Sequence, residues 1–111
     1  MPIFAKLYEF YKELYQILKI FPQKDRYSLG QKIETVILQV FELLFSVNQA
    51  GPSKKVEILT SVNAKLDLAK ILIRLAKDNK CLDIKKYLRL QEQLQEIGKM
   101  AGGWLRYTKT L

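Results

Sequence analysis

Apolar residues recur along the chain at alternating intervals of three and four, the spacing that places side chains on one face of an α-helix. The first such stripe ends at Pro22, because proline cannot continue a helix. Its members are Phe4, Leu7, Tyr11, Leu14, Leu18 and Phe21. Three further segments with such stripes follow, so the pattern predicts four helices, over residues 3–21, 29–49, 54–78 and 84–107.

The predicted second helix carries two apolar stripes. The core-facing stripe comprises Ile33, Val36, Ile37, Val40, Leu44 and Val47. Leu38, Phe41 and Phe45 form the second stripe, on another side of the same helix. A helix that is apolar nearly all round is buried nearly all round, and the core of one small bundle covers only one side. The second stripe therefore predicts contact with another subunit; the alternative is a central helix that its own chain covers tightly.

The third and fourth helices each show one stripe that we predict to face the core. In the third helix the stripe consists of Leu59, Val62, Leu66, Ala69, Ile73 and Ala76. In the fourth helix it consists of Ile84, Tyr87, Leu88, Gln91, Leu94, Ile97, Ala101 and Leu105.

Polar side chains at the joints provide candidate helix caps. Ser28, Ser53 and Asp83 precede or begin the second, third and fourth helices, where their oxygens can accept hydrogen bonds from free backbone amides. The joints are short, and short connections force neighbouring helices to run antiparallel. We therefore predict an all-α fold, an antiparallel up-down-up-down four-helix bundle, as one domain over residues 1–111.

Basic side chains gather in the second half of the chain. In total, 19 Lys and Arg stand against 11 Asp and Glu, a net charge of +8. Residues 53–80 carry seven basic and three acidic side chains, or +4, and residues 81–111 carry six and three, or +3. Such a surface favours polyanions, although small proteins are also basic for solubility alone. The candidate nucleic-acid or partner contacts are Lys70, Arg74, Lys77, Lys85, Lys86 and Arg89; a solvated helix face is the alternative for each.

The composition argues against catalysis, metal binding and a membrane segment. The chain has no histidine and one cysteine, Cys81, which removes Ser-His-Asp and Cys-His catalysis and most zinc sites. A lone thiol suits a reducing cytosol. The most apolar run, residues 36–45, is far shorter than the roughly 20 residues of a spanning helix. We expect a cytoplasmic protein with no cofactor and no membrane contact; a small enzyme built in a bundle core is an alternative, but the chain lacks a Glu-x-x-His pair.

Three glycines lie late in the predicted fourth helix, within EIGKMAGGWLRYTK at residues 96–109. Each glycine inside a helix costs about 1 kcal/mol relative to alanine. Gly98 and Gly102 are four residues apart and leave a strip almost without side chains, along which another helix can approach closely. Trp104 and Leu105 follow directly and need burial. We interpret the strip, with Trp104, as part of a subunit interface; a fraying C-terminus is the alternative.

Three segments, in order through nearly the whole chain, carry a family pattern. They are DRYSLGQKIETVILQVFELL at residues 25–44, LDLAKILIRLAKDNKCLDIKKY at residues 66–87 and EIGKMAGGWL at residues 96–105. Together they resemble the accessory variability determinant (Avd) proteins of diversity-generating retroelements. A sister branch, the ribosomal-RNA intervening-sequence proteins, shares the pattern at residues 21–33, but its small-residue segment ending near NIAEG has no counterpart in this chain.

The resemblance implies a non-catalytic accessory protein. Avd proteins form ring-like homopentamers of four-helix protomers, bind nucleic acid through positive surface and associate with the reverse transcriptase of the retroelement. That complex copies a template-repeat RNA into adenine-mutagenised cDNA. We therefore expect a pentameric homo-oligomer whose partners are the reverse transcriptase, RNA and, as a further candidate, DNA. The alternatives are an intervening-sequence-type protein and a protein-interaction bundle that does not bind RNA.

A ring requires two different contact faces on each protomer. The second stripe of the second helix and the glycine strip of the fourth would provide them, which gives as interface residues Leu38, Phe41, Phe45, Gly98, Gly102 and Trp104. Among the basic residues, Arg74 and Lys77 fall within RLAKD, part of the family-like segment, and are the best candidates for contact with nucleic acid.

Overall fold

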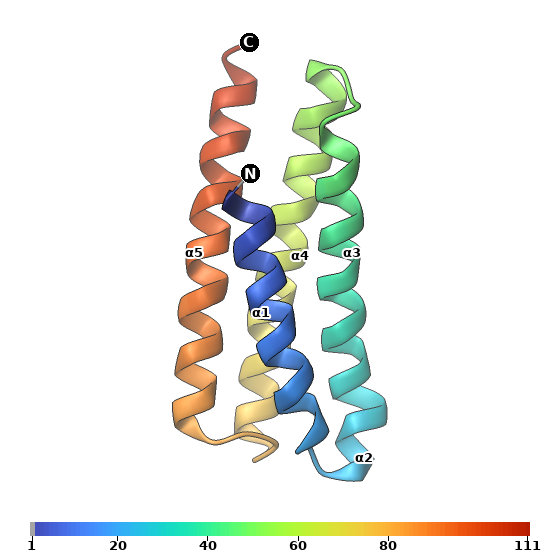
Figure 1. Cartoon of the computed structure of the whole chain (residues 1–111), viewed down its shortest axis with the longest axis vertical. Coiled ribbons are helices and arrows are strands. Elements are labelled where there is room, and N and C mark those ends of the chain that lie inside the picture. Colours follow the sequence, from blue (N-terminus) through green and yellow to red (C-terminus); the bar gives the residue numbers. More distant parts are fainter. Residues whose placement is uncertain (1) are drawn as a thin grey trace.

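Helices make up nearly all of residues 2–111, the part of the chain that the computed structural model describes. A short helix α2 (Gln23–Asp25) and one π-helical segment η1 (Arg26–Gly30) lead directly into the second long helix. Consecutive long helices run antiparallel (Figure 1), so the predicted all-α four-helix bundle is confirmed. The long helices are α1 (Pro2–Lys19), α3 (Gln31–Val47), α4 (Pro52–Asp78) and α5 (Ile84–Lys109).

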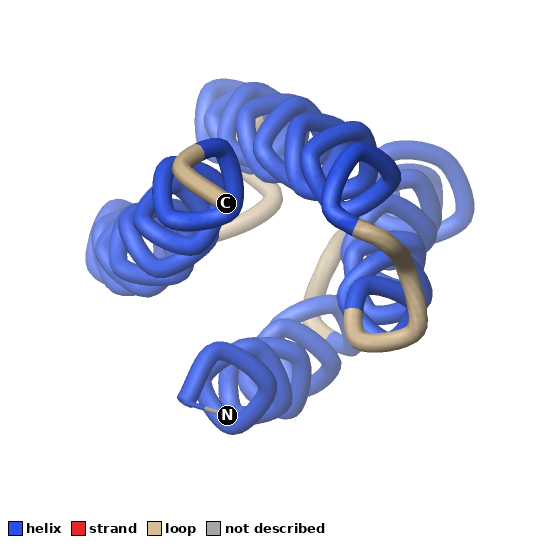
Figure 2. Tube along the Cα trace, turned by 90° about the horizontal axis from the view of Figure 1, so that it is seen from above, coloured by secondary structure: helices blue, strands red, loops and turns tan. Residues whose placement is uncertain are grey.

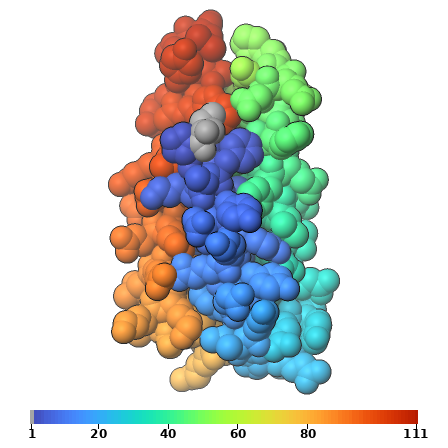
Figure 3. Space-filling view, in the orientation of Figure 1, coloured from blue at the N-terminus to red at the C-terminus, as the bar shows by residue number. Residues whose placement is uncertain are grey.

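The long helices occupy the four corners of the bundle, and α1 and α4 lie diagonally opposite each other (Figure 2). α4 packs along α3 on one side and along α5 on the other. α1 closes the remaining corner but is short: the ends of α3 and α5 extend beyond its start (Figure 1, Figure 3). Because α3 and α5 flank α4, the outer side of α4 is left to face solvent or a partner, and so is the outer edge of its seam with α5.

The predicted stripes of α3 and α4 form the centre of the core. All six residues of the core-facing stripe in α3 are buried, and so are all six in α4. The stripe of α1 is rotated from the predicted one: Ile3, Phe10 and Ile17 are buried, whereas Phe4 and Tyr11 are only partly covered. Two overlapping apolar patterns are possible on α1, and packing against α3 and α5 selects between them.

The predicted core face of α5 is wrong at its start. Ile84 and Leu88 are each 58% exposed, whereas Leu90, outside the predicted stripe, is 1% exposed. Gln91 lies at the seam with α4, where its side-chain amide donates a hydrogen bond to the carbonyl oxygen of Lys70 at 2.9 Å. With Gln91 at the seam, the neighbouring Leu90 faces the core.

The continuous helical stretch of α2, η1 and α3 begins at Gln23, more than one turn before the predicted start of the second helix at residue 29. Ser28 is therefore not a cap: it lies inside the helical stretch, and its hydroxyl donates to the carbonyl oxygen of Lys24 at 3.1 Å. Gly30 in the same stretch is buried, and a Cβ added to it would lie 3.3 Å from a side-chain carbon of Leu18. The absence of a side chain at Gly30 thus allows α1 and η1 to approach closely.

The other two predicted caps differ in outcome. Ser53 lies within the first turn of α4, which begins at Pro52, and proline suits the first position of a helix. The cap at Asp83 is confirmed, because its carboxylate accepts a hydrogen bond from the backbone amide of Lys86 at 2.8 Å.

Replacing Leu90 tests the orientation of α5. Leu90→Ala is expected to lower the free energy of unfolding by about 2–5 kcal/mol, because it leaves a cavity in the core. Leu88→Ala, the matched control on the same helix, is expected to change it by about 0.5 kcal/mol or less. Urea unfolding followed by circular dichroism measures both, and equal losses of stability would contradict the inward orientation of Leu90.

The cap of α5 should depend on pH. The hydrogen bond from the backbone amide of Lys86, followed by that from its ammonium group, lowers the pKa of the Asp83 carboxyl below its ordinary value of about 4. A lowered pKa in the folded state stabilises the fold above the ordinary value, and the stabilisation is lost as the pH falls through the lowered pKa.

Asp83→Asn keeps an acceptor oxygen but cannot ionise. We expect this variant to lose part of the acid dependence of the free energy of unfolding, in the range below about pH 4. Urea unfolding of both chains at a series of pH values measures the difference. Two curves that stay parallel across this range would contradict the role of the charge.

Candidate nucleic-acid interface

Basic side chains from two helices meet where α4 packs against α5. Lys70, Arg74 and Lys77 follow one another along α4 at intervals of four and three residues, so they share one side of that helix. Lys99 and Arg106 of α5 line the same groove as Lys70. We call this surface the α4–α5 basic face, and it consists of Lys70, Arg74, Lys77, Lys99 and Arg106.

A groove of about 490 Å³ runs along this face, with Gly98 and Gly102 among the residues that line it. A Cβ added to Gly98 would lie 3.7 Å from the Nζ atom of Lys70, and one added to Gly102 would lie 3.6 Å from the guanidinium of Arg106. Within residues 2–111, the atoms nearest these added Cβ atoms are the ends of flexible side chains rather than the backbone of another helix, so close helix packing does not require the two glycines. The space that they leave is bordered by cationic side chains.

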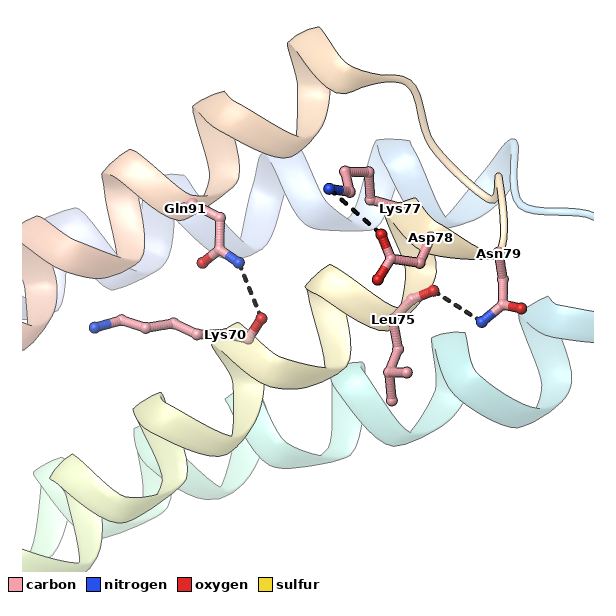
Figure 4. A network of polar contacts seen from close by, with 6 residues as sticks. All are labelled: Lys70, Leu75, Lys77, Asp78, Asn79 and Gln91. Atoms are coloured by element: carbon pink, nitrogen blue, oxygen red, sulfur yellow. Dashed lines mark hydrogen bonds and ion pairs between the residues drawn. The ribbon is translucent and has the colours of Figure 1, made fainter.

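Contacts with α5 position the α4 part of the face (Figure 4). The hydrogen bond from Gln91 fixes the backbone at Lys70, whose side chain extends away from Gln91. The Nζ atom of Lys77 lies 4.7 Å from the ring centroid of Tyr87 and 3.4 Å from a carboxylate oxygen of Asp78. The cation–π contact orients the charge of Lys77 over the seam between the two helices.

Three of the five cations are available to an external anion. Within residues 2–111, Arg74, Lys99 and Arg106 form no ion pair, and all three are exposed. Lys70 has only a long contact of 3.9 Å with Asp67. Exposed pairs of this kind contribute little, so a phosphate group can replace the carboxylate.

The other predicted basic residues lie apart from this face. Arg89 pairs with Glu13 of α1 at 2.5 Å, and Lys86 pairs with Asp83 at 3.2 Å. Both line a different groove, between α1 and α5. Lys85 is exposed and forms no ion pair among the described residues. The predicted set is therefore divided between two sides of the bundle.

The predicted interface residues are divided as well. Leu38 and Phe45 are exposed on α3, and Phe41 between them is partly covered by Tyr11 of α1. Trp104 packs against the hydrophobic core. Gly98 and Gly102 instead line the groove of the α4–α5 basic face.

Neither the single cysteine nor the acidic side chains of residues 2–111 form a second candidate site. Cys81 is buried, and burial, followed by the nearby Asp25, raises the pKa of its thiol, which disfavours the reactive thiolate. Among residues 2–111, no three His, Cys, Asp or Glu side chains gather closely enough to hold a metal ion. In the same part of the chain, no helix combines the length and apolar character that crossing a membrane would require.

A family model described as bAvd-like matches residues 1–108. The chain belongs to the bAvd-like family. The family resemblance inferred from the three segments is confirmed, and it is the Avd branch that the match supports. Bacterial Avd proteins are non-catalytic accessory proteins of diversity-generating retroelements. No curated protein matches the chain.

The sequence alone does not predict two residues of the α4–α5 basic face, Lys99 and Arg106. They are seven residues apart on α5, a spacing that places them on one side of a helix. Their proximity to Lys70 depends on how α4 and α5 are aligned lengthwise, which the sequence of either helix does not reveal. The spacing alone could have paired them with each other but not with α4.

Alanine at the two groove glycines tests whether the bAvd-like fold requires them. Gly98→Ala and Gly102→Ala are each expected to raise the free energy of unfolding by up to about 1 kcal/mol, because alanine favours helix and the added Cβ meets only the flexible ends of Lys70 and Arg106, at ordinary contact distance. Gly30→Ala is the comparison variant: it should gain less, since its Cβ would crowd α1. Thermal unfolding ranks the three. A large drop in stability at Gly98 or Gly102 would show that a neighbour packs tightly there.

Proposed function

We propose that this protein is the nucleic-acid-binding accessory subunit that supports mutagenic cDNA synthesis by the reverse transcriptase of a diversity-generating retroelement. The observation that carries the proposal is the groove in which Lys70, Lys99 and Arg106 surround Gly98 and Gly102. Family membership supports the retroelement setting.

The α4–α5 basic face suits phosphate groups better than bases. Its contacts come from flexible ammonium and guanidinium groups, which attract a phosphate backbone of any sequence. The missing side chains at Gly98 and Gly102 leave room for the backbone to approach these charges. We therefore infer that template RNA, or the cDNA, binds here with weak sequence preference and strong salt dependence.

The division of labour follows from the chemistry of the chain. The groove gathers the side chains of Lys70, Lys99 and Arg106, and cationic groups of this kind bind and position phosphate groups. We propose that the reverse transcriptase catalyses the synthesis and that this protein holds the nucleic acid beside it. We further propose that it acts as a homo-oligomer, a pentamer by analogy with Avd rings, since several basic faces in one assembly bind a long polyanion more tightly than one.

Charge reversal tests the proposal. Arg74→Glu combined with Lys99→Glu is expected to weaken binding to a structured RNA, and to reduce the slope of log Kobs against log salt by about 0.9 for each phosphate that the variant no longer neutralises. Fluorescence anisotropy across a salt series measures both quantities. The matched control is Lys86→Glu combined with Arg89→Glu, which makes the same change in net charge on the side where α1 and α5 meet.

The control pair should affect RNA binding less, because Glu13 and Asp83 already neutralise these two residues. Equal effects of the two pairs would contradict the assignment of the face, since net charge alone would then explain them. A wild-type chain that binds no RNA even at low salt would contradict nucleic-acid binding and would favour a protein-interaction bundle.

A further inference from the structure

A groove of about 280 Å³ lies where the end of α1 meets η1 and the first turn of α3. We call it the α1–η1 groove, and its aromatic, charged and amide lining residues are Tyr15, Lys19, Arg26, Tyr27, Gln31 and Glu34. α1 and α3 form the edge of the bundle opposite the edge formed by α4 and α5 (Figure 2). The α1–η1 groove is therefore separate from the α4–α5 basic face.

The backbone at this groove includes the π-helical segment η1. Turns of this kind are rare and often occur at functional sites. Tyr27 lies in η1, and Gln31 and Glu34 follow it at intervals of four and three residues. All three line the groove, so η1 and the first turn of α3 present these side chains on one side of the helical stretch.

Two cations in the groove have no carboxylate partner. Within residues 2–111, neither Lys19 nor Arg26 forms an ion pair, although Glu34 lines the same groove. The Nζ atom of Lys19 lies 5.0 Å from the ring centroid of Tyr15, a cation–π contact that holds the charge beside the groove. Both cations are therefore available to an anion from outside the chain.

Arg26 is held in place by the end of α1. Its Nη2 atom donates a hydrogen bond to the backbone carbonyl oxygen of Lys19. Its Nε atom is buried and has no acceptor in the described part of the chain. A partly buried cation whose N–H groups lack acceptors is costly, and a nearby anion offsets part of that cost. The planar guanidinium also matches the geometry of a phosphate group.

Tyr27 offers a flat apolar surface at the same place. Its side chain is 66% exposed, and no aromatic ring or lysine of residues 2–111 stacks on it. The ring of Tyr15, in contrast, already contacts Lys19 and Tyr11. Unpaired bases stack on exposed aromatic side chains beside cations in proteins that bind single strands. Tyr27 is thus a candidate platform for one base.

The carboxylate of Glu34 restricts what the groove can bind. One of its oxygens accepts a hydrogen bond from the hydroxyl of Tyr11 at 2.8 Å, which fixes the carboxylate. Burial, followed by this hydrogen bond, raises the pKa of Tyr11 to about 12, so the donor stays protonated at neutral pH. The other oxygen can accept from an amine. The carboxylate would repel a ligand that is anionic throughout, such as a polyphosphate.

We propose that the α1–η1 groove binds a single nucleotide. Its phosphate contacts Lys19 and Arg26, its base stacks on Tyr27, and an amine of the base donates a hydrogen bond to Glu34. Adenine, cytosine and guanine carry such an amine, whereas uracil carries an acceptor oxygen in its place. The groove lies at the small end of the range for ligand pockets, about 300–1,000 Å³, which suits one nucleotide and not a duplex.

This site goes beyond the proposed function, because it contacts the base as well as the phosphate. No aromatic residue lines the groove of the α4–α5 basic face, so that face attracts phosphate groups whatever the base. The nucleotide in the α1–η1 groove can come from two sources, free in solution or unpaired within an RNA strand. Both present the same phosphate and base.

Titration calorimetry with adenosine monophosphate tests the site. Tyr27→Ala is expected to weaken binding about tenfold, the usual order of effect when a stacking side chain is removed. Lys19→Ala should weaken it less, because exposed ionic contacts are weak. The matched controls are Tyr8→Ala and Lys12→Ala, from a second tyrosine–lysine pair of α1, with 5.8 Å from Nζ to the ring centroid, that does not line the groove.

The control variants should bind like the wild-type chain, and circular dichroism confirms that all four are folded. Equal losses of affinity for Tyr27→Ala and Tyr8→Ala would overturn the inference. A trinucleotide of adenosine distinguishes the sources. If it binds more tightly than the monophosphate and still depends on Tyr27, the ligand is an unpaired nucleotide of a strand, and equal affinities indicate a free nucleotide.

Base preference tests the contact with Glu34. Cytidine and uridine monophosphate differ at the position of the amine, so the wild-type chain should bind the cytidine nucleotide more tightly. Glu34→Gln should narrow the difference, because its amide can donate to the oxygen of uracil. Equal binding of the two nucleotides by the wild-type chain would contradict this contact.

The charge-reversal variant of the α4–α5 basic face separates this inference from the proposed function. Arg74→Glu combined with Lys99→Glu should bind adenosine monophosphate like the wild-type chain. A loss of nucleotide binding in this variant would place the nucleotide on the basic face and overturn the inference. A wild-type chain that binds structured RNA but no mononucleotide, even at low salt, would also overturn it and would leave the proposed function intact.

Discussion

Burial of one stripe on α4 is the constraint on which the rest of the molecule depends. Once Leu59, Leu66 and Ile73 face the core, helical geometry determines the direction of every other side chain on that helix. Lys70 and Lys77 must then lie along the seam with α5, and Ile71 must point outward. One buried row thus separates a cationic side from an aliphatic side on the same helix.

The same geometry explains why some elements could be predicted from the sequence. On α3 and α4 one arrangement buries a continuous row of aliphatic side chains, and the predicted stripes are buried throughout. On α1 and α5 neighbouring apolar residues allow more than one arrangement, so the spacing predicts neither Phe10 nor Leu90 as core and wrongly includes Leu88. Local spacing cannot choose between such patterns, because the choice depends on the helices packed alongside.

The candidate site was predictable to a similar extent. The α4 cations follow from the spacing within one helix, whereas their grouping with Lys99 and Arg106 depends on the relative position of two helices. The glycines illustrate the same point. Gly98 and Gly102 do leave a strip without side chains, but the register of α4 against α5 places the amine of Lys70 over it. The space left by the glycines of α5 is a candidate anion site because a charged side chain of α4 lies beside it.

Because α1 is short, the two ends of the groove of the α4–α5 basic face differ in how firmly the surrounding helices hold them. Near Lys70 the backbone is clamped by Gln91 in the middle of the bundle, where four helices surround the core. Near Arg106, α5 has passed the start of α1, and fewer helices flank its final turns (Figure 1). Segments held by fewer contacts open at lower free energy than the core does, so amide hydrogen exchange should become faster towards the end of α5. An anion lying in the groove would meet a cation on a firmly held backbone at one end and a cation on a more mobile backbone at the other.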